Sequence, residues 1–162
     1  MSEEVKYFVR IDISKAYLEI VGRANYLNCK AVGEFFDMAL RRGCGAFYIN
    51  FARCKGMDST FMGMIAGLAL RLLKSGKPGA VSLCSIDGRN LELVENLGLE
   101  SIVKLENSCD VFNAREVLNS QTATKPEILS AHKSLIEANP ANAREFEDIV
   151  KFMQREIERS GQ

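Results

Sequence analysis

Hydrophobic and polar residues alternate along two short segments near the start of the chain. Residues 7–13 and residues 16–21 each carry an apolar side chain at every second position, so these side chains would share one face of an extended strand. Only Ser14 and Lys15 separate the two segments. The pattern therefore predicts a β-hairpin, with Ile13 among the inward-facing residues.

The period then changes from that of a strand to that of a helix. Apolar residues follow the spacing i, i+3, i+4, i+7, i+8 from Val32 to Leu40, Asn28 can cap this helix, and Gly43 follows its end. Residues 46–51 come next and are apolar almost without alternation, which is typical of a strand covered on both faces. Because a helix joins this strand to the one before it, we expect the two strands to be parallel.

The alternation of helices and strands continues to residue 119. The same criteria predict helices at residues 59–75, 90–97 and 107–118 and strands at residues 80–84 and 102–105, with Asn107 or Ser108 as the cap of the last helix. The resulting order is ββαβαβαβα. It predicts an α/β fold in which a mixed, mainly parallel sheet begins with a hairpin and packs against helices.

A different pattern follows the polar residues 120–124, which read as a linker. Thr124 and Glu127 have the spacing of a capping box, and Asn142 can cap a second helix after the break at Pro140. The chain thus divides into a domain at residues 1–119, a linker at 120–124 and a helical hairpin at 125–162. We expect the apolar stripes of the hairpin to pack against each other and against the domain or a second copy of it.

The composition is that of a folded soluble domain. The 162 residues are 47% hydrophobic and 26% charged, and 21 Lys and Arg balance 21 Asp and Glu, so no basic field attracts nucleic acid or acidic lipid. No apolar stretch approaches the ~20 residues that a membrane-spanning helix needs, and residues 1–4 are acidic where a signal peptide is basic. We expect a cytoplasmic protein without membrane insertion.

Few residues offer catalytic or metal chemistry. The five cysteines form no C-x-x-C pair, so we expect reduced core residues instead of a disulfide framework or a zinc site. His132 is the single histidine, and no glycine-rich phosphate loop is present. Ser59 lies at a strand-to-helix turn, like a hydrolase nucleophile, but without the G-x-S-x-G pattern. We therefore expect no enzyme, cofactor or metal, with a small hydrolase using Ser59 or a cysteine as an alternative.

The helix that starts at Ser59 carries apolar residues on two faces. One stripe can cover the sheet, and the second, formed by Phe61, Met64 and Leu68, is either buried by a neighbouring helix or exposed to another protein. Gly63 and Gly67 stand four residues apart. We interpret them as packing residues that permit a close approach to the sheet.

The segment Met57-Asp58-Ser59-Thr60-Phe61-Met62-Gly63 resembles the D-S-S-G-L-G signature of STAS domains, the anti-sigma factor antagonist family. The resemblance extends over roughly residues 5–119. It includes Ile20-Val21-Gly22, Phe47-Tyr48-Ile49-Asn50-Phe51, Leu83-Cys84-Ser85 and Leu97-Gly98-Leu99. The fold that it implies, a sheet of mixed direction with helices against it, agrees with the pattern of strands and helices.

The resemblance also implies a function. In that family, an anti-sigma factor that is also a serine kinase phosphorylates the serine after the motif aspartate, and a phosphatase restores it. Ser59 would be this site, with Thr60 as the alternative acceptor. The unmodified protein would bind the anti-sigma factor and the phosphorylated protein would release it, so that the switch regulates bacterial transcription. The partner-binding residues would be Met57, Asp58, Ser59, Thr60, Phe61 and Met64.

Two departures from the signature leave a second interpretation open. Thr60 replaces the second serine of the motif, and the bulky Phe61 replaces its first glycine. The protein could therefore be a constitutive adaptor in a regulatory or lipid-transport complex that binds without phosphorylation. Ser59 would then be a helix cap only, with Asp58 as a second capping residue. A homodimer formed through residues 125–160 also stays open.

Overall fold

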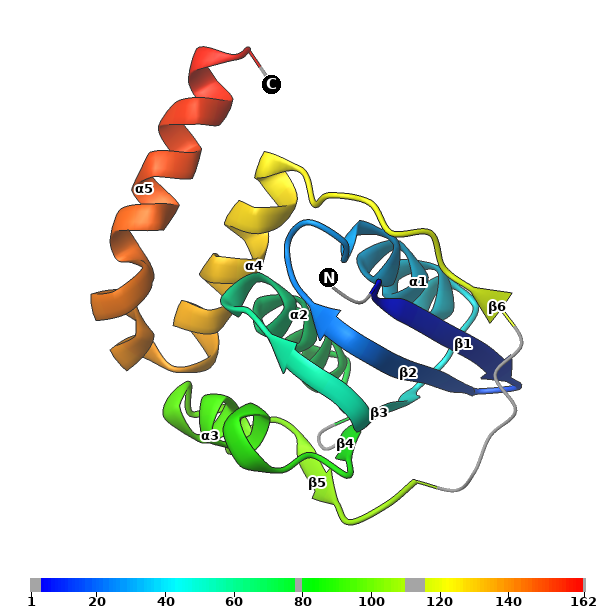
Figure 1. Ribbon diagram of the computed structural model, residues 1–162. Coiled ribbons are helices and arrows are strands. Elements are labelled where there is room, and N and C mark those ends of the chain that lie inside the picture. Colours follow the sequence, from blue (N-terminus) through cyan, green and yellow to red (C-terminus); the bar gives the residue numbers. More distant parts are fainter. Residues whose placement is uncertain (1–3, 78–79, 110–115, 162) are drawn as a thin grey trace.

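The computed structural model describes residues 4–77, 80–109 and 116–161, which include one six-stranded sheet with helices packed around it (Figure 1). The strands are β1 (Lys6–Asp12), β2 (Lys15–Ala24), β3 (Ala46–Met57), β4 (Val81–Cys84), β5 (Lys104–Glu106) and β6 (Glu116–Val117). The helices are α1 (Lys30–Arg41), α2 (Ser59–Lys74), α3 (Gly88–Asn96), α4 (Lys125–Ala138) and α5 (Ala143–Arg159). Short 3-10 turns lie at Leu99–Ser101 and Pro140–Asn142.

The sheet is mixed, with the strand order β5-β4-β3-β2-β1-β6. β1 pairs antiparallel with β2 and with β6, whereas the pairs β2–β3, β3–β4 and β4–β5 are parallel. Helices α1, α2 and α3 each join two parallel strands, as such connections require. The α/β class predicted from the sequence, a mainly parallel sheet that begins with a hairpin, is confirmed.

The hairpin turns one residue earlier than the alternation predicts. Asp12 pairs with Lys15, so that Ile13 and Ser14 form the turn. Ile13 has a positive φ of 54° and is 91% exposed, which makes the prediction of an inward-facing side chain wrong. The turn decides this, because a residue in left-handed conformation cannot continue the pleat of the strand.

Helix α1 begins without the predicted asparagine cap. Its N-cap is Cys29, which makes no side-chain capping bond. The Asn28 side chain instead accepts hydrogen bonds from the Tyr7 hydroxyl and the Asn25 backbone N–H, and donates to the Arg23 carbonyl. Asn28 thus satisfies polar groups between the first two strands and α1, and is unavailable to the helix.

The predicted helix at residues 107–118 is also wrong at the end that the structure describes. Glu116 and Val117 form strand β6, which pairs with Val9 and Phe8 of β1. The rest of that predicted helix falls mainly on residues 110–115, which lie outside the described residues. A free strand edge explains the change, because its unpaired backbone groups find partners in β6.

Two of the cysteines are paired, against the expectation of five reduced thiols. A disulfide joins Cys84, at the end of β4, to Cys109, which follows β5. Because β4 and β5 are parallel neighbours, the ends of both strands meet at one edge of the sheet, and the two Cα atoms lie 5.4 Å apart. Cys29, Cys44 and Cys54 are free thiols.

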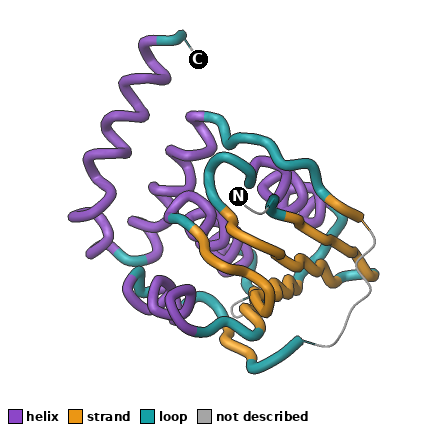
Figure 2. The backbone as a smooth tube through the Cα atoms, in the orientation of Figure 1, coloured by secondary structure: helices purple, strands orange, loops and turns teal. Residues whose placement is uncertain are grey.

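The last two helices form the predicted hairpin, and α4 lies between α2 and α5 (Figures 1 and 2). The Thr124–Glu127 capping box at the start of α4 is confirmed, with both reciprocal hydrogen bonds present. Ile128 and Leu135 of α4 belong to the same hydrophobic core as the residues of the sheet. The hairpin is therefore packed against the domain in this structure.

Both ends of α4 are tied to the domain. Before α4, the Ala123 N–H donates to the Tyr26 carbonyl at 2.7 Å. At the turn into α5, the buried Asn142 amide donates to the Leu97 carbonyl at 2.9 Å and to the Leu135 carbonyl at 2.8 Å. The described residues contain no helix that is long and apolar enough to span a bilayer.

Candidate functional site

Ser59 is the first residue of α2 and follows directly on the cap of that helix. Strand β3 ends at Met57, and Asp58 is the N-cap, whose carboxylate accepts hydrogen bonds from the backbone N–H groups of Phe61 and Tyr26, each at 2.9 Å. Both carboxylate oxygens are therefore engaged. Asp58 fixes the start of α2 against the loop after β2, and leaves Ser59 partly exposed at the helix N-terminus.

The Ser59 hydroxyl is hydrogen-bonded to His132 of α4. Ser59 Oγ lies 2.9 Å from His132 Nε2, and His132 Nδ1 lies 2.8 Å from the Ile128 carbonyl oxygen. The imidazole is buried, with 2% of its surface exposed, and its ring packs against Phe146 of α5. The single histidine of the chain thus joins the helical hairpin to the candidate phosphorylation site.

The partners of the imidazole define the hydrogen-bond directions. A carbonyl oxygen can only accept, so His132 Nδ1 carries a proton and donates to Ile128. In the neutral ring Nε2 then has a free lone pair, and the Ser59 hydroxyl donates its proton to it. The geometry is that of a serine held by a histidine whose orientation is set by a backbone carbonyl.

Gly63 and Gly67 face α4, so the expectation that they approach the sheet is wrong. A Cβ atom on Gly63 would lie 2.8 Å from the Cα of Ala131, and closer still to its carbonyl group. A Cβ atom on Gly67 would meet only the Ser134 side chain, with its hydroxyl oxygen at 3.0 Å. Gly63 thus brings the backbones of α2 and α4 together one turn after Ser59.

The six residues predicted to bind a partner fall into two groups by their exposure. Met57, Asp58, Ser59 and Met64 are partly exposed. Thr60 is 4% exposed and Phe61 is fully buried, with its ring stacked on Tyr7 at a centroid distance of 6.2 Å. The sequence left open whether the stripe that contains Phe61 is buried or exposed; Phe61 is buried, and neither Phe61 nor Thr60 is accessible to a partner in this conformation.

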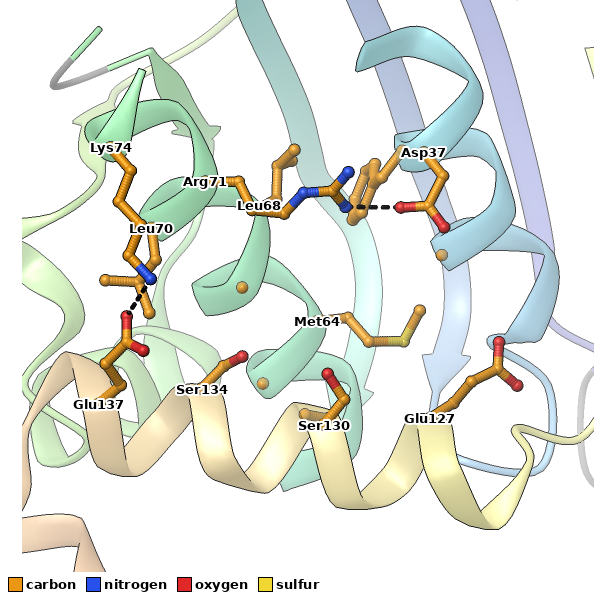
Figure 3. A pocket seen from close by; sticks show the side chains of 15 residues that line it. Asp37, Met64, Leu68, Leu70, Arg71, Lys74, Glu127, Ser130, Ser134 and Glu137 are labelled. Atoms are coloured by element: carbon orange, nitrogen blue, oxygen red, sulfur yellow. Dashed lines mark hydrogen bonds and ion pairs between the residues drawn. The ribbon is translucent and has the colours of Figure 1, made fainter. Parts of the chain in front are cut away.

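A groove of about 310 Å³ runs beside the site, between α1, α2 and α4. Figure 3 shows Met64 extending across this groove from α2. A Cβ atom added to Gly33 in α1 would lie 2.6 Å from the Met64 Cε atom. Ser130 and Ser134 face the groove from α4, and ion pairs flank it, Arg71 with Asp37 at 2.6 Å and Lys74 with Glu137 at 3.1 Å. Ser59 and His132 do not line it.

The three free thiols are poor nucleophiles. Burial raises the pKa of Cys29 to about 12, and the carboxylates of Asp58 and Glu127 act in the same direction. Burial also raises the pKa values of Cys44 and Cys54 above their ordinary range. All three thiols therefore stay protonated at neutral pH, and only the thiolate form reacts readily. Within the described residues, no group of His, Cys, Asp and Glu could hold a metal ion.

Solved structures share the arrangement of strands and helices. The crystal structure of TM1081, a candidate anti-sigma factor antagonist from Thermotoga maritima, matches with a TM-score of 0.56 and 19% identity, over 63% of this chain and 86% of its own. The anti-sigma factor antagonist SpoIIAA in its unphosphorylated form matches with a TM-score of 0.53 and 14% identity, over 64% of this chain and 90% of its own. This chain has the STAS fold. Its sequence matches no family model and no curated protein.

On the STAS fold, the site contains two residues from outside the motif, His132 and Ala131, whose contacts with α2 the sequence did not predict. His132 is separated from Ser59 by 73 residues, and Ala131 is its neighbour in α4. The capping box in the sequence predicts where α4 begins, but no local pattern indicates which helix α4 packs against. The contact of His132 with α2 forms only when the sheet and its helices are assembled.

Proposed function

We propose that this protein is an anti-sigma factor antagonist that works by partner switching. The unphosphorylated protein binds an anti-sigma factor with serine kinase activity, phosphorylation of Ser59 releases that partner, and a phosphatase resets the switch. The proposal places the protein in the bacterial cytoplasm, where sigma factors act.

The place of Ser59 on the STAS fold supports this role. Ser59 is the first residue of α2, directly after the capping aspartate, and is the hydroxyl residue of the motif that keeps some exposure. A helix N-terminus has free backbone N–H groups and a partial positive charge, which favours a phosphate there by about 0.3–1 kcal/mol. Phosphorylation of Ser59 is therefore compatible with a folded domain. Thr60 is buried and is a poor acceptor.

The experiment is a capture from cells that naturally make the protein, with wild-type, Ser59→Ala and Ser59→Asp full-length chains as baits. We expect wild type and Ser59→Ala to recover a protein with an ATP-binding kinase domain, and Ser59→Asp to recover at least tenfold less, which corresponds to ~1.4 kcal/mol. Ser130→Asp is the matched control, because Ser130 is an exposed serine on α4. Mass spectrometry of the native protein tests for phosphate on Ser59.

Equal capture by wild type and Ser59→Asp, with no phosphate on Ser59, would refute the switch and leave the constitutive adaptor. The adaptor would bind its regulatory or lipid-transport complex in one state only. A homodimer also stays a prediction, which light scattering on the purified full-length chain tests.

The hydrogen bond between Ser59 and His132 favours one further candidate, acyl transfer. Ser59 Oγ could attack an ester carbonyl while His132 Nε2 takes its proton and passes it to the leaving alcohol, and water would then release the acyl group. No carboxylate orients His132 here, because Nδ1 is bound by a backbone carbonyl. Hydrolysis of p-nitrophenyl acetate by wild type but not by Ser59→Ala would support this candidate, and equal rates would remove it.

A further inference from the structure

Helix α4 occupies the surface of α2 that a partner at Ser59 would need. Its Ala131 rests on Gly63 with no side chain between the two backbones, and its His132 binds the Ser59 hydroxyl. Ala131 and His132 are 3% and 2% exposed. A partner that reaches Ser59 and the first two turns of α2 therefore meets this chain's own helix there.

The contact between α4 and the domain is one-sided. On the α2 side it is apolar and close, through Ala131 and the buried Ile128 and Leu135. On the α1 side α4 presents serine and glutamate side chains to the groove (Figure 3). One partly exposed ion pair joins Glu127 to Lys30 of α1, and a largely exposed one joins Glu137 to Lys74 of α2; such pairs contribute little. Between the hydrogen bonds at its two ends, α4 is thus held mainly by the strip that contains Gly63 and Ser59.

We propose that the surface of α2 around Ser59 and Gly63 is a helix-binding surface whose occupant is α4 of the same chain, and that a phosphoryl group on Ser59 displaces α4 from it. This inference rests on the proposed phosphorylation of Ser59. A partner would compete with α4 for the surface, and phosphate would oppose both.

The geometry at Ser59 gives the physical reason. Only 2.9 Å separates Ser59 Oγ from the buried His132 Nε2, and a phosphoryl group would replace the single proton between them with phosphorus and three oxygens. It would also bring about −1.5 to −2 charges next to the Asp58 carboxylate, whose oxygens are already engaged. The N-terminus of α2 can accept this charge, but the filled space under α4 cannot. We therefore expect α4 to leave while the sheet stays folded.

Amide hydrogen exchange on the full-length chain tests the displacement without any partner. Phosphoserine is incorporated during synthesis at position 59 or, as a matched control, at the exposed Ser130 of α4. With phosphoserine at 59 we expect amides of α4 and α5 to exchange at least tenfold faster than in wild type, while amides of β3 are unchanged. Phosphoserine at 130 should leave both unchanged.

A second pair of variants removes α4 without altering the α2 surface. Ala131→Glu places a large charged side chain where Ala131 touches Gly63, and Ser130→Glu adds the same residue at the neighbouring exposed position. We expect faster exchange in α4 and α5 for Ala131→Glu only. If Ala131→Glu also loses amide protection in β3, that variant has destabilised the whole domain. The comparison of phosphoserine at 59 with phosphoserine at 130 then tests the displacement of α4.

The proposal is overturned if phosphoserine at 59 leaves the protection of α4 unchanged or increases it, as it would if His132 held the phosphate. Equal loss of protection with phosphoserine at 59 and at 130 would overturn it as well, since the effect would then be one of general charge. Because no partner takes part, retained protection refutes the displacement alone. Failure of the capture experiment while phosphate is found on Ser59 refutes the proposed partner switching alone.

Discussion

The substitution Gly63→Ala places one methyl group into the contact between α2 and α4. The new Cβ atom would lie 2.8 Å from the Cα of Ala131 and nearer still to its carbonyl group, so the two backbones must move apart. Overpacking of this kind typically costs about 1–3 kcal/mol. Within α2 itself, alanine is favoured over glycine by about 1 kcal/mol, so any loss of stability must arise at the contact with α4.

Gly67→Ala is the matched control one turn further along the same helix. Its Cβ atom would meet only the Ser134 side chain, where the hydroxyl at 3.0 Å can rotate away and the Cβ atom at 3.7 Å is in ordinary contact. The gain in helix propensity is the same at both positions, so it cancels when the two variants are compared. We expect Gly63→Ala to be less stable than Gly67→Ala by about 1–3 kcal/mol.

Urea unfolding followed by circular dichroism measures this difference, and amide hydrogen exchange locates it. The exchange of α4 amides should rise in Gly63→Ala and stay at the wild-type level in Gly67→Ala. In a domain of this size, 1 kcal/mol corresponds to about 2–4 °C in melting temperature. Equal stability of the two variants, with equal protection of α4, would refute the reasoning that the two helices meet backbone to backbone at Gly63.

Three further predictions follow from buried polar groups and thiols. Asn142→Asp keeps the shape of the side chain but loses both amide donations, so we expect a loss of about 1–3 kcal/mol in urea unfolding, and wild-type stability would contradict the role of Asn142. Because burial raises the pKa of Cys29 from 9.0 to about 12, the unfolded chain loses this proton first as the pH rises. The free energy of unfolding should therefore be fully retained below pH 9 and fall above it by up to ~1.4 kcal/mol per pH unit, and Cys29→Ala should show a shallower decline. The disulfide between Cys84 and Cys109 spans 25 residues, so Cys109→Ser should be less stable than the oxidised wild type by about 3–4 kcal/mol and equal to it in reductant; a difference that persists in reductant would assign the loss to packing.

The local pattern of the sequence was sufficient for the elements and for several of their ends. Alternation placed the two strands of the hairpin, and the helical period placed α2 to within a residue. Thr124 and Glu127 marked the start of α4 because a capping box uses only neighbours in the chain. The cap of α2 is Asp58, the second candidate, and not Ser59, which is the first residue of the helix. The motif around Ser59 pointed to the STAS fold through residues that are adjacent in sequence.

Contacts between elements were decided only by the tertiary structure. The sequence could not show that Ser59 and His132 meet across 73 positions, or that Gly63 faces Ala131 and not the sheet. The period left open whether Phe61 is buried or exposed, and the structure buries it against Tyr7. The hydrophobic period indicates which side of a helix is covered. Which element covers that side depends on how the helices pack on the sheet, and this packing is determined by contacts along the whole chain.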